Sequence, residues 1–287
     1  MRAVYKHELR LFFHTLTAYV FGAFLLVFIG IGAMRYNLTA AVSNFEYVLS
    51  FSCLIFVVIV PILTMRIIAE ERKQKTDQLL YSLPVTTTQV VAGKFLALLT
   101  VYLIPFAIIC IYPLIFSSFG DVYLPTSYGS LLAYFVMGAA LIALGIFISS
   151  LTENQGLAAG IGIAVILFNY YSVSISEYVS STATGSLIAI CVIVVILAVI
   201  VRCLTKNDMV SIGVGAILLI VTIVSYFINP DSFEGLLPSV MSQLSLFERF
   251  YNFVNGVFDM TAIVYYLTFM AFFLFLSVQS LEKRRYN

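Results

Sequence analysis

The segment Ala69–Lys94, AEERKQKTDQLLYSLPVTTTQVVAGK, is a charged island between two long apolar runs. The chain around it has 287 residues, of which 62% are hydrophobic and only 10% are charged. Soluble domains usually carry about 25% charged residues, so most of this chain must lie in lipid. The sequence therefore predicts an all-α integral membrane protein in which residues 1–287 form one transmembrane domain and the island is a loop between two spans.

Eight apolar segments are candidates for membrane spans, because a spanning helix needs about 20 mostly apolar residues. The fifth segment is short and the sixth begins in a stretch rich in Ser and Thr, so a count of six or seven spans stays open. The eight segments are Leu16–Met34, Tyr47–Ala69, Phe95–Ser117, Tyr128–Leu151, Leu157–Val173, Ser186–Leu204, Met209–Ile228 and Ala262–Leu281.

Lys and Arg are distributed unequally over the connections between these segments. If the number of spans is even, only Arg35 and Arg249 of the 15 basic residues lie on the side opposite the termini. The acidic residues are divided equally between the two sides, so the bias lies in Lys and Arg alone. Loops rich in Lys and Arg stay in the cytoplasm. We therefore expect both termini and the loop 70–94 to be cytoplasmic.

Two segments outside the spans have the pattern of amphipathic helices. Residues 1–15 predict an interfacial helix on the inner face, with Lys6 and Arg10 at the headgroups and Phe12 and Phe13 in lipid. The external loop 229–261 contains SQLSLFERFYNFVNGVFD, whose apolar residues recur at helical spacing. That spacing predicts a second amphipathic helix, in or near the outer leaflet and before the last span.

The sequence lacks the residues that catalysis, ATP binding or ion coupling would need. No P-loop and no recognisable hydrolase motif occurs, so we expect no catalytic residue and no ATP bound by this chain. No Asp, Glu, Lys or Arg lies near the centre of a predicted span, which disfavours a secondary carrier. His7 and His14 have no third ligand nearby, so no metal site is expected. A net charge of +1 gives no reason to expect a nucleic-acid partner.

The fifth predicted span carries Asn169 and Tyr170, which are polar groups inside an otherwise apolar segment. They are candidates for a substrate path through the membrane. The alternative is a hydrogen bond between two helices, which is the commoner use of such residues in membrane proteins and which we favour.

The charged island has the features of a short helix followed by a sharp stop. Acidic residues come first in it and basic residues follow, which is the order that the helix dipole favours. Leu79, Leu80 and Leu83 then form a small apolar patch, and Pro84 ends the segment. Thr86, Thr87 and Thr88 can each cap the next helix, and Gln89 stands at the capping-box position for Thr86. A solvated loop that binds headgroups would explain the basic residues but not the leucine patch, so we expect the segment to dock in a groove of a cytosolic partner.

The island resembles the coupling-helix region of ABC-2 type permeases, the membrane subunits of ATP-binding-cassette exporters. That region typically reads E-E-R-x-x-G-T-x-x-L-L-x-x-P-V-[ST], followed by G-K-x-x-A at the start of the next span. The usual glycine is Lys75 in this chain, which argues against a sharp backbone turn there but leaves the docking role intact. The stretches TDQLL, LFERFYNFVNGVFD and YYLTFMAFFLFLSVQSLEKRR are similar to the gliding-motility-type subgroup, and YKHELRLFF resembles the family's opening helix.

The resemblance implies a bacterial permease subunit in the cell membrane that pairs with an identical or related permease. Two cytosolic ATPase subunits would bind ATP and Mg²⁺, and the exported substrate would be a lipid, peptide or hydrophobic drug. A membrane scaffold or immunity-type accessory protein that does not transport is the alternative. The residues implied in ATPase coupling are Glu70, Glu71, Arg72, Thr76, Asp77, Leu79, Leu80, Leu83 and Pro84.

Overall fold

A computed structural model describes residues 1–76, 86–178, 182–205 and 208–285. Every regular element among these residues is a helix, which confirms the all-α prediction. The chain divides into two compact units, unit 1 (Met1–Tyr170 and Arg249–Asn287) and unit 2 (Tyr171–Glu248). Each unit is described by itself, and a single domain over residues 1–287 stays a prediction.

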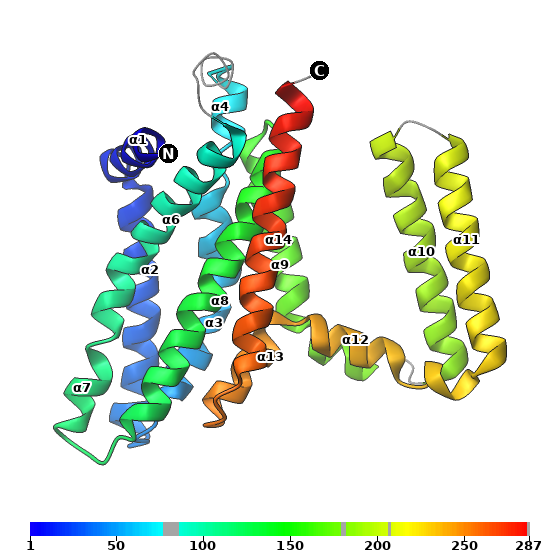
Figure 1. Cartoon of the computed structure of the whole chain (residues 1–287). Helices are drawn as coiled ribbons and strands as arrows, with labels where there is room; N and C mark the ends of the chain where they lie inside the picture. The colour runs from blue at the N-terminus through cyan, green and yellow to red at the C-terminus, as the bar shows by residue number, and fades with distance from the viewer. Residues whose placement is uncertain (77–85, 179–181, 206–207, 286–287) are drawn as a thin grey trace. The chain divides into compact units, whose positions relative to one another are not determined.

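Unit 1 contains most of the helices, and both chain termini belong to it (Figure 1). Its elements are α1 (Arg2–His14), α2 (Leu16–Ala33), the π-helix η1 (Met34–Thr39), α3 (Glu46–Thr64), α4 (Ala69–Lys73), α6 (Thr87–Ile109), α7 (Tyr112–Ser117), α8 (Leu124–Leu151), the greater part of α9 (Gln155–Tyr178), the later part of α13 (Leu246–Val254) and α14 (Met260–Arg285).

Unit 2 is built on a pair of helices, α10 (Ala183–Thr205) and α11 (Asp208–Ile228), which pack against each other. The 3₁₀-helix η2 (Pro230–Phe233) and the helix α12 (Leu236–Leu244) follow α11. The ring of Tyr226 on α11 meets the ring of Phe233 edge to face, with centroids 5.5 Å apart. The external loop predicted at 229–261 is therefore largely helical.

All eight predicted spans fall on helices of the structure. Six helical segments of the described residues, on α2, α3, α6, α8, α9 and α14, are long and apolar enough to cross a membrane. Within α10 and α11, the described residues contain the apolar stretches Ala183–Val192 and Gly215–Ile228. These findings confirm a multi-pass membrane protein, with six spans by length and composition among the described residues.

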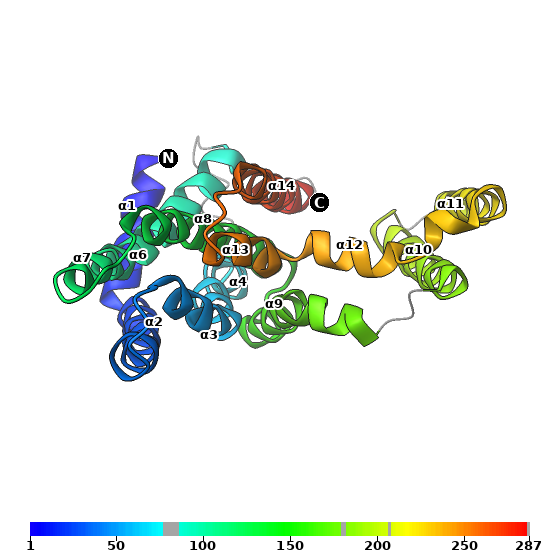
Figure 2. The same ribbon diagram turned by 90° about the horizontal axis from the view of Figure 1, so that it is seen from below.

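The helix α8 forms the centre of unit 1, where it packs against α3, α6 and α14. Figure 2 shows the helices of this unit nearly end on. Close approach to α8 depends on two glycines. A Cβ at Gly138 would lie 2.7 Å from the hydroxyl of Tyr102 on α6, and a Cβ at Gly145 would lie 2.8 Å from Cβ of Thr64 on α3. Since Cβ atoms do not approach other atoms this closely, a larger residue at either position would displace the neighbouring side chain.

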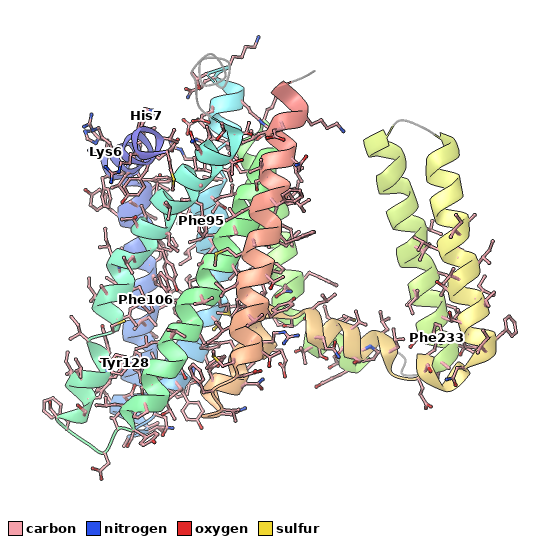
Figure 3. All side chains as sticks on the ribbon, in the orientation of Figure 1. Lys6, His7, Phe95, Phe106, Tyr128 and Phe233 are labelled. Atoms are coloured by element: carbon pink, nitrogen blue, oxygen red, sulfur yellow. The ribbon has the colours of Figure 1, made fainter. Side chains whose placement is uncertain are left out.

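The predicted interfacial helix is present as α1, but part of its apolar face is covered by protein. Lys6 and Arg10 are exposed as expected, and Figure 3 shows Lys6 directed away from the bundle. Phe12 is buried, and so is Glu8 one turn before it. The helix α1 packs mainly against α6. The expectation that Phe12 enters lipid was therefore wrong. The face of α1 that carries Glu8 and Phe12 packs against other helices of unit 1.

The predicted external amphipathic helix corresponds to α13, whose later part belongs to unit 1. Phe250 and Phe253 are buried, and the Ser130 hydroxyl on α8 donates to the Phe253 carbonyl at 2.9 Å. These two rings of the predicted apolar face therefore contact protein rather than lipid. Asp259 caps the next helix, α14, by accepting from the Thr261 N–H at 2.8 Å. Slight burial acts to raise the pKa of Asp259, but hydrogen bonds from Thr261 and Asn252 outweigh it and keep that pKa below its usual value.

Candidate functional site at the charged end of unit 1

Three ion pairs of the described residues lie at one end of unit 1: Arg66–Glu70, Lys94–Glu8 and Lys94–Glu71. This end comprises α1, α4, the first turns of α6 and the last turns of α8 and α14 (Figure 1). We call it the charged end. The predicted ATPase-coupling loop starts here, since residues 69–76 leave α3 by a turn and form α4 before the chain continues to α6.

The base of this loop is fixed by Ser149 near the end of α8. Its hydroxyl accepts from the N–H groups of Ile68 at 3.2 Å and Ala69 at 3.1 Å, and it donates to the Met65 carbonyl at 3.1 Å. The regular helical bonds are interrupted at these residues, because Met65–Ile68 form a turn between α3 and α4. One buried hydroxyl thus satisfies backbone groups that a helix break would leave unpaired.

The helix α4 ends in a left-handed turn at Lys75, where φ is +57°. The Lys75 N–H donates to the Arg72 carbonyl at 3.1 Å, and the Thr76 N–H donates to the Glu71 carbonyl at 3.0 Å. This pair of bonds is a Schellman motif, which usually has glycine at the left-handed position. The argument from Lys75 against a sharp turn was therefore wrong: the turn is present, and a lysine adopts it.

A buried ammonium group joins three helices at the charged end. Nζ of Lys94 on α6 lies 2.6 Å from Oε1 of Glu8 on α1 and 2.6 Å from Oε1 of Glu71 on α4. It also donates to the Ile67 carbonyl at 2.8 Å. The side chain of Lys94 is only 1% exposed. An ammonium group has three N–H donors, and all three are used here.

The Glu8–Lys94–Glu71 triad holds two carboxylates against one cation. Removing one partner from a buried ion pair typically costs about 3–5 kcal/mol, because the charge left behind has lost its solvent and its counterion. The triad therefore ties α1 and α4 to the first turns of α6. It restricts α4, and with it the start of the loop, to one position relative to these helices.

Arg72 fixes α4 to α8 from the other side. This side chain is 4% exposed, and its Nη1 donates to the Ser150 carbonyl. The same carbonyl accepts from the hydroxyl of Ser280 on α14 at 3.0 Å. The hydroxyl of Thr87, the first residue of α6, donates to Oε1 of Glu282 on α14 at 2.7 Å. Five helices thus meet through polar contacts at this end.

Glu70 lies on a more open side of α4. Both of its carboxylate oxygens accept from Arg66, at 2.7 Å and 3.2 Å, which is the two-pronged geometry typical of arginine and carboxylate. Arg66 also donates to the Thr17 hydroxyl on α2 at 3.2 Å. Thr76 donates through its hydroxyl to the Glu71 carbonyl at 3.3 Å.

The predicted site residues thus divide into four groups. Glu71 and Arg72 hold the loop to Lys94 and to the Ser150 carbonyl, while Glu70 and Thr76, which are half-buried like Glu71, pair with Arg66 and with the Glu71 carbonyl. Asn169 and Tyr170 are half-buried on α9, at the boundary of unit 1. Their role in a substrate path stays a prediction. The residues predicted for the tip of the loop lie outside the described residues; they are Asp77, Leu79, Leu80, Leu83 and Pro84.

Sequence reasoning missed Glu8 and Lys94 as members of this site. The sequence contained a sign that Glu8 is buried. Glu8 lies one helical turn from Phe12 and therefore shares the face of the helix that was assigned to lipid. A carboxylate on a buried face needs a partner. The identity of that partner could not be read from the sequence, since Lys94 is 86 positions away.

Comparison with known proteins identifies the family of this chain. The model of the ABC-2 family transporter proteins matches residues 31–228. No curated protein and no solved structure matches the chain.

Proposed function

Since the chain belongs to the ABC-2 family of transporter proteins and is a multi-pass permease, we propose that it is the membrane subunit of an exporter driven by separate ATPase subunits. Two cytosolic ATPases would bind ATP and Mg²⁺, and a second permease, identical or related, would complete the pathway in the bilayer. The charged end would face the cytoplasm of a bacterial cell, as the distribution of Lys and Arg favours. The gliding-motility-type subgroup stays a prediction.

The single observation that carries this proposal is the way the loop is held. A coupling loop can transmit force only if its base is rigid with respect to the spans that must move. The triad and the Arg72–Ser150 bond give such a base, because they connect α4 to α1, α6 and α8. Closure of the ATPase dimer could then displace the loop and the ends of these helices together.

In this proposal the subunit transmits movement and catalyses no reaction. The two states of the permease dimer must bind the closed ATPase dimer with different free energies, since only a differential affinity can shift an equilibrium. Glu71 and Arg72 would act by holding the loop, and the leucines predicted for its tip would contact the ATPase. The substrate we propose is hydrophobic or amphipathic: a lipid, a peptide or a drug.

Affinity purification of the chain from its native membrane tests this proposal. We expect a P-loop ATPase to co-purify, and we expect the triple variant Leu79→Ala, Leu80→Ala, Leu83→Ala to lose it while keeping the unfolding midpoint of the wild type. Leu114→Ala is the matched control, because this leucine is half exposed on α7 and far from α4 in the fold. A wild-type preparation without an ATPase, or a triple variant that retains the ATPase and full transport, would contradict the proposal.

A further inference from the structure

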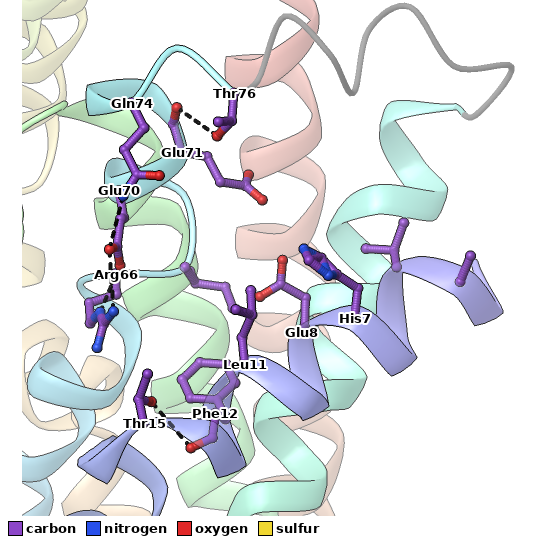
Figure 4. Close-up of a pocket in the computed structure, with 13 residues that line it drawn as sticks. His7, Glu8, Leu11, Phe12, Thr15, Arg66, Glu70, Glu71, Gln74 and Thr76 are labelled. Carbon is purple, nitrogen blue, oxygen red and sulfur yellow. Dashed lines mark hydrogen bonds and ion pairs between the residues drawn. The ribbon is translucent and has the colours of Figure 1, made fainter.

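A cavity of about 620 Å³ lies between α1 and residues 66–76, which comprise the turn after α3, the helix α4 and its C-terminal turn (Figure 4). Its size falls within the range of about 300–1,000 Å³ that is usual for small-molecule sites. Its wall has two parts. Val4, Leu11 and Phe12 of α1 give an apolar surface, and Glu8, Glu70 and Glu71 give a surface of carboxylates.

The charges on the cavity wall do not cancel. Glu70 is neutralised by Arg66, which also lines the cavity and holds both of its oxygens. Glu8 and Glu71 share the single cation Lys94, which lies behind them. With Glu8 and Glu71 both ionised and His7 neutral, the ion pairs of the described residues leave one negative charge at this cavity without a countercharge.

From this geometry we propose that the cavity binds a small amphiphilic cation, with its ammonium group at Glu8 and Glu71 and its hydrophobic part along α1. Lys94 contacts Oε1 of each carboxylate, and a carboxylate has a second oxygen that can accept further hydrogen bonds. The Glu71 side chain is 23% exposed, so a ligand can reach it. A second cation at this point would balance the charge of the triad.

The dimensions favour a small molecule over a basic side chain of a partner protein. The cavity is several times larger than one lysine or arginine side chain, and one wall is apolar along more than two turns of α1. An anionic ligand is disfavoured, because it would meet two carboxylates in place of a free cation. Amphiphilic cations also concentrate at membrane surfaces, where an interfacial helix such as α1 would lie.

Fluorescence titration with monodansylcadaverine tests the proposal, because this probe has a primary ammonium group and an apolar fluorophore. The full chain is placed in nanodiscs of neutral phosphatidylcholine, and the signal of empty nanodiscs is subtracted. We expect saturable binding to the wild type and binding at least about tenfold weaker for the N-acetylated, neutral probe, since a hydrogen bond between two charged groups is roughly twice as strong as one between neutral groups.

The variant His7→Lys adds a positive charge to the wall and leaves the triad intact, since His7 lines the cavity beside Glu8 (Figure 4). We expect it to weaken binding of the charged probe at least about tenfold by like-charge repulsion. The control His7→Gln should bind as the wild type does, and both variants should show the wild-type unfolding midpoint. Equal binding of the charged and acetylated probes, or unchanged binding by His7→Lys, would overturn the proposal. The ATPase is absent from this measurement, so the result is independent of the proposed export function.

Discussion

The charged end of unit 1 is joined through a few buried ions, whereas the opposite end is joined mainly through aromatic rings. At the charged end, one nitrogen atom of Lys94 contacts carboxylates on two other helices at 2.6 Å. At the opposite end, the buried ring of Phe45 lies 5.9 Å from the ring of Tyr112 and 6.2 Å from that of Phe116. Tyr36 likewise stacks on Tyr47 with centroids 6.3 Å apart.

These two ways of joining helices respond differently to change. Dispersion between rings is the sum of many weak contacts, so a smaller side chain loses part of it and the rest remains. A buried triad depends on every member, because the loss of one leaves the others charged in a poorly polarisable environment. We infer that the contacts of the charged end are kept or lost together, whereas those of the aromatic end are lost one at a time. A change of the first kind suits a region that transmits movement.

The largest effect is expected for Lys94→Met, which keeps the length of the side chain and removes the ammonium group. Two carboxylates then face each other without a cation, and we expect a loss of about 3–5 kcal/mol in the free energy of unfolding. Titration with sodium dodecyl sulfate, followed by circular dichroism in mixed micelles, measures this quantity.

Lys6→Met is the matched control for Lys94→Met, because Lys6 is an exposed lysine on the same end of the unit. It should change stability by less than about 0.5 kcal/mol. Adding Glu8→Gln and Glu71→Gln to Lys94→Met should restore much of the loss, since no charge is then stranded. If the triple variant is as unstable as the single one, the triad does not join the helices by its charge.

A smaller effect of opposite sign is expected for Lys75→Gly. Lys75 has a left-handed backbone, which costs a side-chain-bearing residue about 1–2 kcal/mol and costs glycine little. Part of this gain is lost again because glycine gives the unfolded chain more freedom. We expect a net stabilisation of about 0.5 kcal/mol in the same titration.

Lys75→Ala separates backbone strain from charge in this experiment. It removes the ammonium group of Lys75 but keeps the Cβ atom, so the left-handed strain stays. We expect no stabilisation from this change. If Lys75→Ala stabilises as much as Lys75→Gly, the gain comes from the lost charge and not from the turn.

The predictions from sequence succeeded where the signal is local. All eight apolar segments fall on helices, because hydropathy over about 20 residues is a strong local signal. The cap at Thr86 was also found, since α6 begins at Thr87 and the Gln89 N–H donates to the Thr86 hydroxyl at 3.3 Å. A capping box extends over only four residues, and its partners are therefore visible together.

The candidate site could be predicted only in part, because its contacts join distant parts of the chain. Glu71 was found in the island, but its partner Lys94 was treated as the start of the next span and Glu8 as part of an interfacial helix. The left-handed turn at Lys75 was missed for another reason. Its residue type gives no sign of a positive φ, and the bonds that stabilise it come from the backbone.

The smallest effect is expected for Glu46, a buried carboxylate at the aromatic end. It is 1% exposed, and its Oε1 accepts from the Ser127 hydroxyl at 2.9 Å. Its Oε2 has no hydrogen-bond partner among the described residues, and no basic side chain is paired with it there. Glu46→Gln therefore leaves no cation stranded, in contrast to the loss of Lys94.

Two small contributions of opposite sign determine how Glu46→Gln changes the free energy of unfolding. Removing the buried charge relieves a desolvation cost, but Glu46 is the first residue of α3, where the helix dipole favours a negative charge by about 0.3–1 kcal/mol. The amide can still accept from Ser127 and the two opposing terms largely cancel, so we expect a net change of less than about 0.5 kcal/mol in the detergent titration. A loss as large as that of Lys94→Met would mean that Glu46 has a strong ionic partner, and the contrast between the two ends of unit 1 would then be incorrect.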